Sequence, residues 1–351
     1  MSTLKVDGIR SNSASSDAIT LAGDGTCTAN ITNNLSNRNL IINGAMQCAQ
    51  YGSSSTTNGY GSLDRFKCTH EGTDEAVTHA QADVASGTTP YSLGFRKSMK
   101  LTNGNQTSIG GGDVVGIDTI IEADDVAQSG WNYTSSSSFI TLSFWVKSSV
   151  AQNFYGYMYA PNRSGGGDLY SFETGSLSAD TWTKITKVIP GQSNVTFSAG
   201  TGFGIQFQIW AFLGTSYTGS TTMNQWAGYS SGTRTPDNTS TWYTTNDATF
   251  EITGVQLEVG SVATDFEHRS YADELRRCQR YFFYDGTQRF HYGNTDQEHY
   301  DFPVTLRTNP SVTLVDIPTG GNVNRARPNW VTITGMGSNV GNIRVKADAE
   351  L

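Results

Sequence analysis

Aromatic and amide side chains alternate with apolar ones in three stretches of this 351-residue chain. In residues 154–160 every second residue is a tyrosine, and strand geometry places these tyrosines on one face. Residues 204–212 and 139–147 show the same alternation, with glutamines and a tryptophan in the first and a single tryptophan in the second. The residues that would form the shared face are Trp145, Tyr155, Tyr157, Tyr159, Gln206, Gln208 and Trp210.

If the three stretches belong to one sheet, their outer side is a surface of rings and amides. Flat rings can stack on the C–H faces of sugars, while side-chain amides donate to and accept from sugar hydroxyls. Exposed aromatic patches usually mark a contact surface. We therefore predict a glycan-binding face. Two alternatives stay open, namely packing under a loop or against a second subunit, and binding of another class of ligand.

Catalytic groups are harder to find. Glycan cleavage needs two carboxylates about 5 to 10 Å apart across a groove. None of the five histidines lies in an HExxH frame or beside a Gly-x-Ser-x-Gly turn. We predict no catalytic residues and no enzymatic activity. The acids considered for such a role are Asp113, Asp118, Glu122, Asp124, Asp125, Glu251 and Glu258.

The four cysteines, Cys27, Cys48, Cys68 and Cys278, lack CxxC spacing and a histidine partner pattern. We expect free, mostly buried thiols and no zinc site. A structural calcium ion remains open, because sandwich modules can hold one with acidic side chains and carbonyls. Asp64, Asp113 and Asp118 could contribute to such a site, although no EF-hand-like spacing is present. No other cofactor is predicted.

The net charge of −8 argues against nucleic acid as a partner, because phosphate binding needs a basic surface. Arg276, Arg277 and Arg280 form a basic cluster. A solvated face or ion pairs between chains explain this cluster more simply than a nucleic-acid site does. No apolar run has the length of a membrane span, and no secretory signal is recognisable, so we expect no membrane insertion.

The elements that must position these residues are predicted to be strands. Apolar residues alternate with polar ones in four stretches, 98–102, 139–147, 154–160 and 204–212. Glycine- and serine-rich turns separate these stretches. An apolar run at residues 40–46 is also expected to be a strand. Many short strands without intervening helical patterns are typical of a two-sheet sandwich, so residues 37–265 are predicted to form a jelly-roll β-sandwich. Residues 213–247 are predicted to be a long polar surface excursion.

The spacing of apolar residues changes within residues 250–283, from strand-like alternation to helical spacing. Alternating apolar residues continue from Phe250 to Val259, with a phase shift that a bulge at Gly254 would absorb. Apolar spacings of four and three from Tyr271 through Leu275 then predict a helix of about three turns, with Ser270 as its N-cap. Residues 266–284 are therefore a helical joint. Its predicted joint and oligomer-contact residues are Tyr271, Leu275, Arg276, Arg277 and Arg280.

The two ends of the chain complete the predicted organisation. Residues 1–36 are small and polar and cannot bury a core alone. They are predicted to be either a disordered tail or an attachment segment that orders against other chains. Residues 285–351 restart a strand pattern, at 288–292, 300–306, 311–315, 330–334 and 342–346, and predict a smaller C-terminal β-sandwich. The fold class is all-β.

Several motifs follow one another in an order that resembles tail fibres and related appendage proteins of bacteriophages, many of them marine. The motifs are residues 39–46 (NLIINGAM), 64–66 (DRF), 141–147 (TLSFWVK), 252–260 (ITGVQLEVG), 266–271 (FEHRSY) and 278–282 (CQRYF). The resemblance covers about residues 39–283, and residues 302–313 are similar to a distal fibre sandwich. It implies a homotrimeric virion protein that is made in the host cytoplasm and held by other virion proteins through its N-terminus.

The resulting expectation is a non-catalytic phage appendage that adheres to host cell-surface polysaccharide. A purely structural virion decoration or fibre adaptor is one alternative, and a polysaccharide-depolymerising tailspike is another. The absence of a long repetitive β-helix pattern counts against the depolymerase. A non-viral glycan-binding module is a further alternative, because residues 144–146 also resemble the central strand of cellulose- and xylan-binding modules.

Overall fold

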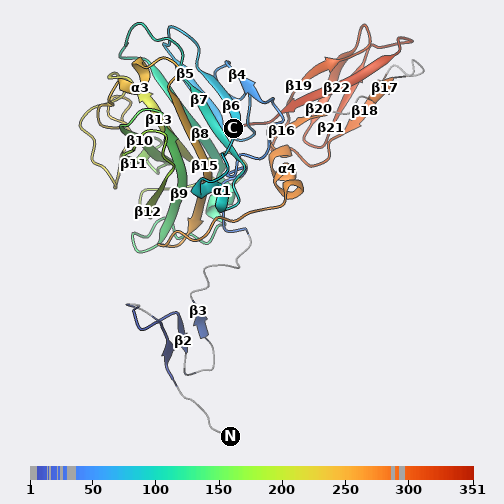
Figure 1. The fold of residues 1–351 in the computed structure, drawn as a ribbon. Coiled ribbons are helices and arrows are strands. Elements are labelled where there is room, and N and C mark those ends of the chain that lie inside the picture. The colour runs from blue at the N-terminus through green and yellow to red at the C-terminus, as the bar shows by residue number, and fades with distance from the viewer. Residues whose placement is uncertain are drawn as a thin grey trace.

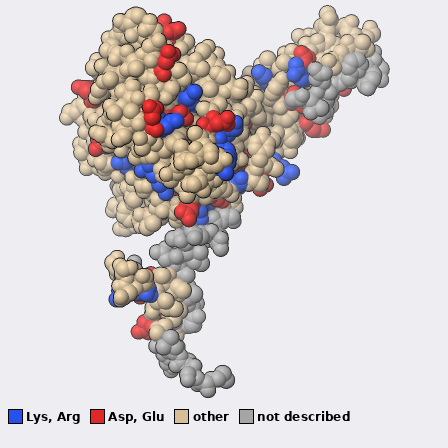
Figure 2. All heavy atoms as spheres, in the orientation of Figure 1, with Lys and Arg blue, Asp and Glu red and all other residues tan. Residues whose placement is uncertain are grey.

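The computed structural model describes residues 6–13, 15, 17–21, 23, 27–29, 37–285, 289–291 and 297–351. Figure 1 shows a large sandwich, a smaller β unit beside it and a short N-terminal sheet. In Figure 2, acidic and basic side chains are interspersed among uncharged residues on the visible face of the large sandwich. The predicted all-β fold with two sandwiches is confirmed. In the part of the chain that is described, no helix is long and apolar enough to cross a membrane.

The large sandwich consists of two antiparallel six-stranded sheets. In spatial order, the first contains β14 (Trp226–Gly228), β11 (Gly167–Ser176), β10 (Asn153–Pro161), β13 (Phe203–Leu213), β8 (Val114–Glu122) and β5 (Lys67–Glu71). The second contains β12 (Thr183–Pro190), β9 (Phe139–Ser148), β15 (Thr249–Val259), β7 (Lys97–Thr102), β6 (Thr78–Asp83) and β4 (Ser54–Ser55). Short helices occupy three connections: α1 (Thr89–Ser92), α2 (Ala123–Ala127) and α3 (Thr241–Thr244).

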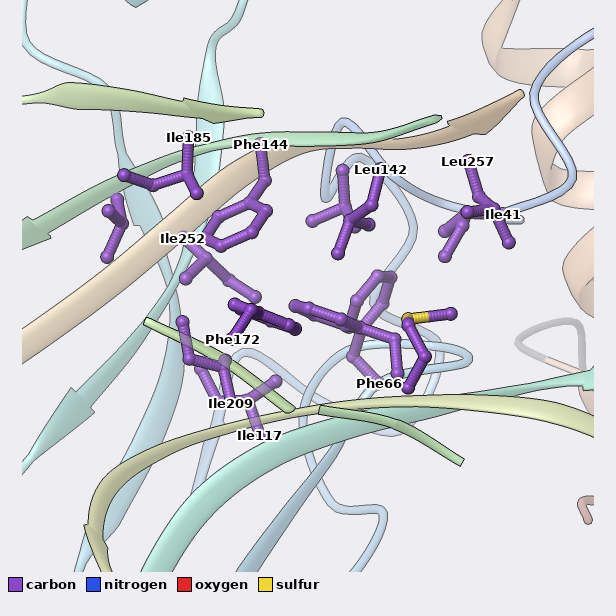
Figure 3. Close-up of a cluster of buried hydrophobic side chains, with 14 of the residues drawn as sticks. Ile41, Phe66, Ile117, Leu142, Phe144, Phe172, Ile185, Ile209, Ile252 and Leu257 are labelled. Carbon is purple, nitrogen blue, oxygen red and sulfur yellow. The ribbon is translucent and has the colours of Figure 1, made fainter. Parts of the chain in front are cut away.

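The core lies between the two sheets. Figure 3 shows Leu142 and Phe144 of the second sheet pointing toward Phe172, Ile209 and Ile117 of the first. The Phe144 ring centroid lies 5.4 Å from that of Phe207. Burial of these large rings is the dominant favourable term for a chain of low overall hydrophobicity. The period-two patterns in the sequence therefore identified the inward sides of β9 and β13, whereas β8 and β11 were not predicted as strands.

The predicted bulge in β15 is confirmed. The register between β15 and β9 shifts between Thr253 and Gln256, and Gly254 has a φ of +63°. A side chain at this position would collide with the ring of Phe95. The shift brings Phe250, Ile252, Val255 and Leu257 to the same core face.

The apolar run at residues 40–46 is buried, but it forms a turn instead of the predicted strand. Its side chains pack into the core, while its backbone is held by single hydrogen bonds. The Asn39 side chain accepts from the backbone N–H groups of Ile41 and Leu257, each at 3.0 Å. Asn43 has a φ of +61°, a left-handed conformation that ends any extended segment.

The joint helix α4 (Tyr271–Gln279) confirms the predicted helix and its N-cap, since the Ser270 side chain accepts from the backbone N–H of Asp273. Arg269, just before it, donates to the carboxylate of Glu274 at 3.4 Å and to Glu267 at 3.3 Å. The backbone N–H of Asn39 donates to Glu267 at 2.7 Å. These contacts attach the start of the helix to the large sandwich.

The C-terminal unit is a small two-sheet sandwich with its own core, which includes Phe283, Tyr300, Val331 and Val345. One sheet contains β16 (Phe282–Tyr284), β22 (Gly341–Asp348) and β17 (Arg289–His291), with β19 (Ser311–Asp316) also on β22. The other contains β18 (Gln297–Asp301), β21 (Trp330–Thr334) and β20 (Asn322–Arg327). Residues 288 and 292 of the first strand predicted here lie outside the described residues.

A buried ion pair connects the two sandwiches. The Arg65 guanidinium contacts the Glu350 carboxylate, and these side chains are only 2% and 5% exposed. The same guanidinium lies 3.5 Å above the ring centroid of Tyr281 and donates to the carbonyl of Ile120. Beside it, Tyr51 stacks on Phe282 with ring centroids 3.6 Å apart.

At the N-terminus, β1 (Gly8–Ile9), β2 (Ile19–Leu21) and β3 (Cys27–Ala29) form a three-stranded sheet. Ile9 and Leu21 are exposed on it, and Val6, which precedes the first strand, is exposed as well. Strands this short with uncovered apolar side chains are marginally stable alone. The predicted N-terminal attachment by residues 1–36 stays a prediction, and residues 30–36 lie outside the described part.

Replacing Glu350 by Gln should leave the buried Arg65 without a counter-charge. We expect the free energy of unfolding to fall by about 3–5 kcal/mol, measured by urea denaturation. Glu71→Gln, which alters an exposed carboxylate, should change it by less than about 0.5 kcal/mol. The double variant Arg65→Met/Glu350→Leu should recover part of the loss, and a double variant no more stable than Glu350→Gln would contradict this explanation.

A pH dependence follows from Asp64. Burial raises the pKa of this carboxyl from 3.8 to about 7, although hydrogen bonds from Gln50 oppose the rise. The folded chain therefore holds the proton more tightly than the unfolded chain, so the stability that Asp64 contributes is full below about pH 4 and is lost as the pH rises to about 7.

The non-titrating variant Asp64→Asn should lack this pH-dependent contribution to the free energy of unfolding. We expect the unfolding free energy of the wild-type protein to fall relative to that of the variant between about pH 4 and pH 7. Urea denaturation at a series of pH values measures the difference. Asp83→Asn, at an exposed position, serves as the control, and a difference that stays constant across this range would rule out the raised pKa.

Candidate functional site

Six of the seven predicted face residues lie on neighbouring strands of the first sheet. β10 pairs with β13 so that Tyr155 is opposite Trp210, Tyr157 opposite Gln208 and Tyr159 opposite Gln206. The residues between them, such as Met158 and Phe207, point into the core. We call the outer surface formed by these six residues the tyrosine face.

Trp145 is not part of the tyrosine face, and its predicted place there is wrong. It lies on β9, which pairs with β12 and β15 in the second sheet. There it lines a separate pocket of about 210 Å³ with Phe95, Phe266 and Lys184. Both sheets of a sandwich show the same inward and outward alternation, so the pattern could not say to which sheet the tryptophan belongs.

Strand β8 completes the tyrosine face on its other side. Its register places Gly116 opposite Trp210, Asp118 opposite Gln208 and Ile120 opposite Gln206. A Cβ on Gly116 would lie 2.5 Å from a ring atom of Trp210. The glycine therefore leaves the space that the indole occupies on the sheet.

The polar excursion after β13 covers part of this face. Tyr157 and Trp210 are each only 3% exposed and pack in a small cluster with Leu213, against which Tyr217 of the excursion lies. Tyr155, Tyr159 and both glutamines remain partly exposed. The Trp210 end of the tyrosine face is therefore packed under a loop, which was one of the two alternatives. The Tyr159 end is accessible to solvent.

At the open end lies a pocket of about 310 Å³. Tyr157, Tyr159, Gln206 and Gln208 line it from the sheet, and Tyr229 and Arg234 line it from the excursion. Tyr229 is 43% exposed, and its ring meets that of Tyr159 edge-on with centroids 5.6 Å apart. The pocket thus offers three aromatic rings, two amides and one cation.

Tyr229 and Arg234 were not predicted as site residues. They lie in a stretch of Gly, Ser and Thr without periodicity. The signal available there was a tyrosine and an arginine isolated in a polar loop next to a strand with an aromatic outer side. Binding residues often sit on such loops above a rigid sheet.

Asp118 is the carboxylate closest to the centre of the face. It accepts hydrogen bonds from Gln206 at 2.8 Å and Thr69 at 3.0 Å, and Lys67 lies 3.4 Å away. Burial raises the pKa of this carboxyl, and Lys67 and these hydrogen bonds oppose the rise. The network holds Gln206 in place and neutralises the charge of Asp118.

Most of the acids considered for catalysis have structural partners. Arg280 donates to both oxygens of Glu122 at 2.9 Å, and Lys147 pairs with Glu251 at 2.9 Å. Glu258 accepts from Thr264 at 2.6 Å. Asp113 accepts from the hydroxyl of Tyr243 at 3.0 Å. The predicted absence of enzymatic activity stays a prediction.

The predicted joint residues divide into two groups. Arg280 is engaged with Glu122, and Arg277 donates to the Asn37 side chain at 2.6 Å, so both connect α4 to the large sandwich. Tyr271 and Arg276 are exposed, and Leu275 is half-buried. Contact of these three with other chains stays a prediction.

One group of side chains has metal-ligating chemistry. The ligand atoms of Cys48, Asp64 and Cys278 are buried and lie within 4.8 Å of one another. They offer three of the four ligands of a tetrahedral zinc site, and no other His, Cys, Asp or Glu of the described chain joins the group. Asp64 accepts two hydrogen bonds from Gln50, so the group is satisfied without an ion. Asp64, Asp113 and Asp118, which were considered for calcium, are not brought together with one another in the described chain. The side chain of Cys27 lies outside the described part.

No protein-family model matches the chain, and neither does any curated protein. Among solved structures, an enzymatically active domain of tailspike protein 4 from bacteriophage CBA120 is similar at a TM-score of 0.33 and 12% identity, over 63% of this chain and 21% of that one. The matched part of the chain thus spans about a fifth of the length of that domain's chain.

Two other structures contain carbohydrate-binding modules. The family 11 module of cellulase Lic26A-Cel5E of Clostridium thermocellum is similar at a TM-score of 0.26 and 12% identity, over 62% of this chain and 98% of that one. The tandem CBM22 domain of Paenibacillus barcinonensis Xyn10C is similar at a TM-score of 0.31 and 9% identity, over 91% of this chain and 92% of that one. TM-scores this low carry no argument, so the function must follow from the chain's own side chains.

Proposed function

We propose that this chain binds carbohydrate in the pocket of the tyrosine face. The observation that carries the proposal is the convergence of the rings of Tyr157, Tyr159 and Tyr229 with the amides of Gln206 and Gln208. The rings provide flat apolar surface for sugar C–H faces, and each amide provides both donors and an acceptor for hydroxyls. Mostly apolar pockets with a few placed polar groups are typical of ligand sites.

The pocket is built mostly on rigid elements. Four of its six lining residues lie on paired strands at the centre of the first sheet. Tyr157 is almost fully buried, so its ring has a fixed orientation before any ligand arrives. A preformed site loses little conformational entropy on binding, which favours affinity for a flexible and strongly hydrated ligand.

The biological role that we propose is adhesion by a bacteriophage appendage to polysaccharide on the host cell surface, without catalysis. The phage assignment is supported by the order of sequence motifs from residues 39 to 283. The exposed apolar side chains of the N-terminal sheet support a homotrimer held by other virion proteins.

A purely structural virion decoration is the second candidate. The burial of Trp210 beneath the excursion favours it, because this shows that part of the aromatic face serves packing. In a decoration, the remaining open pocket would be covered by a neighbouring virion protein and would bind no sugar.

Binding can be tested by affinity electrophoresis and calorimetry against a panel of bacterial surface polysaccharides. We expect Tyr159→Ala and Tyr229→Ala each to weaken binding by about tenfold, or about 1.4 kcal/mol, because each removes one stacking ring. Tyr271→Ala removes an exposed tyrosine of α4 and should leave affinity unchanged. Wild-type protein that binds no polysaccharide in the panel would favour the decoration.

The oligomeric state can be tested by light scattering with and without residues 1–36. We expect a trimer for the full chain, because the N-terminal sheet needs a partner to cover its apolar side chains. A trimer that survives the truncation would place the contacts in the sandwich or on α4. A monomer in both forms would contradict the proposed homotrimer.

A further inference from the structure

We infer that the pocket of the tyrosine face selects acidic glycans, and that Arg234 binds the carboxylate of a uronic-acid-type sugar. This inference rests on the proposed carbohydrate binding and names its ligand class. Its basis is a cation that lies in the pocket without an anionic partner in the described chain.

The backbone of Arg234 is fixed from two sides. Its N–H donates to the carbonyl of Tyr217 at 2.9 Å, and its own carbonyl accepts from the Ser171 hydroxyl at 2.7 Å. Ser171 lies on β11 and pairs with Tyr157. The sheet that carries the tyrosines therefore also sets the position of the arginine.

The guanidinium stacks on aromatic rings. It lies 4.5 Å from the ring centroid of Tyr217 and 5.7 Å from that of Tyr229. Such cation–π contacts orient a guanidinium and leave its N–H edges available for a planar anion. It also approaches the Tyr157 hydroxyl, whose pKa is raised by burial, an effect that Arg234 opposes. This tyrosine remains a neutral phenol.

Arg234 has no ion-pair partner among the described residues. Its Nε is buried without a hydrogen-bond partner. A guanidinium has five N–H donors and favours a carboxylate that accepts two of them in parallel. Arg234 differs from the exposed arginines without an ion pair because it lines a pocket among aromatic rings and amides.

The acids around the pocket are engaged elsewhere. Asp118 is paired with Lys67, which leaves that end of the face without net charge. Asp237 accepts from the Thr218 hydroxyl at 2.6 Å, and Glu173 accepts from the Asn153 amide at 2.6 Å. Among the residues that line the pocket, Arg234 alone carries a charge. A neutral sugar would leave it unmatched, whereas a sugar carboxylate would complete it.

The test uses uronic-acid polysaccharides, such as alginate, polygalacturonate and hyaluronate, each beside its carboxyl-reduced form. Reduction converts the carboxylate to a hydroxymethyl group and keeps the linkages, so each pair differs in the charged group alone. We expect wild-type protein to bind at least one acidic polymer ten- to a hundredfold more tightly than its reduced form, since a charged hydrogen bond is lost. Added salt should weaken the acidic complex only.

Arg234→Gln should remove this preference and bind both forms like the reduced polymer. Arg234→Lys should keep part of it, because the charge remains while the planar fork is lost. Arg96→Gln is the matched control, since Arg96 stacks on Tyr91 at 3.9 Å outside the pocket. Circular dichroism and thermal melting of each variant show that it is folded.

The outcomes separate this inference from the proposed function. Equal binding of acidic and reduced polymers, or an acidic preference that survives in folded Arg234→Gln, would overturn the role of Arg234 but leave carbohydrate binding intact. A sulfated galactan bound as tightly as the uronate polymers would overturn recognition of a carboxylate. Absence of binding to every polymer, neutral or acidic, would overturn both.

Discussion

The organisation of this protein depends on the buried ion pair between Arg65 and Glu350. It joins residues that are 285 positions apart in sequence and brings the last strand of the distal sandwich back to the large one. Desolvating two charges costs several kcal/mol, and this cost is offset only where further contacts satisfy both groups. Here the guanidinium also covers Tyr281 and bonds to the Ile120 carbonyl, and Arg307 donates to the carbonyls of Ala349 and Glu350. The two sandwiches are therefore connected through both the joint helix and the C-terminal residues.

Much of the fold could be predicted, because period-two alternation reports burial directly. It identified β7, β9, β10 and β13 and their inward sides, and the phase shift at Gly254 identified the bulge. It failed at residues 40–46, where the side chains are as buried as in a strand but the backbone turns. There Asn39 supplies the hydrogen bonds that a neighbouring strand would otherwise give. Apolar content alone cannot distinguish these two ways of satisfying a buried backbone.

The candidate site could be predicted only in part, for two physical reasons. Alternation along a strand shows which side faces the core, but it carries no information about which of two sheets the strand joins, and Trp145 was misplaced for this reason. Tyr229 and Arg234 reach the pocket from an excursion whose path depends on contacts such as Ser171 with the Arg234 carbonyl. Such contacts between distant residues leave no periodic trace in the sequence.

The charge distribution bears on the specificity that we propose for the site. A net charge of −8 repels anionic polymers at long range, so any acidic glycan must be held by a local feature strong enough to overcome that field. At physiological salt the field of distant exposed charges is screened within about 8 Å, whereas a half-buried guanidinium against tyrosine rings is screened much less. The pocket can therefore attract a carboxylate although the protein as a whole does not. Nonspecific adhesion to other polyanions is disfavoured by the same net charge, which leaves selection to Arg234 and the rings around it.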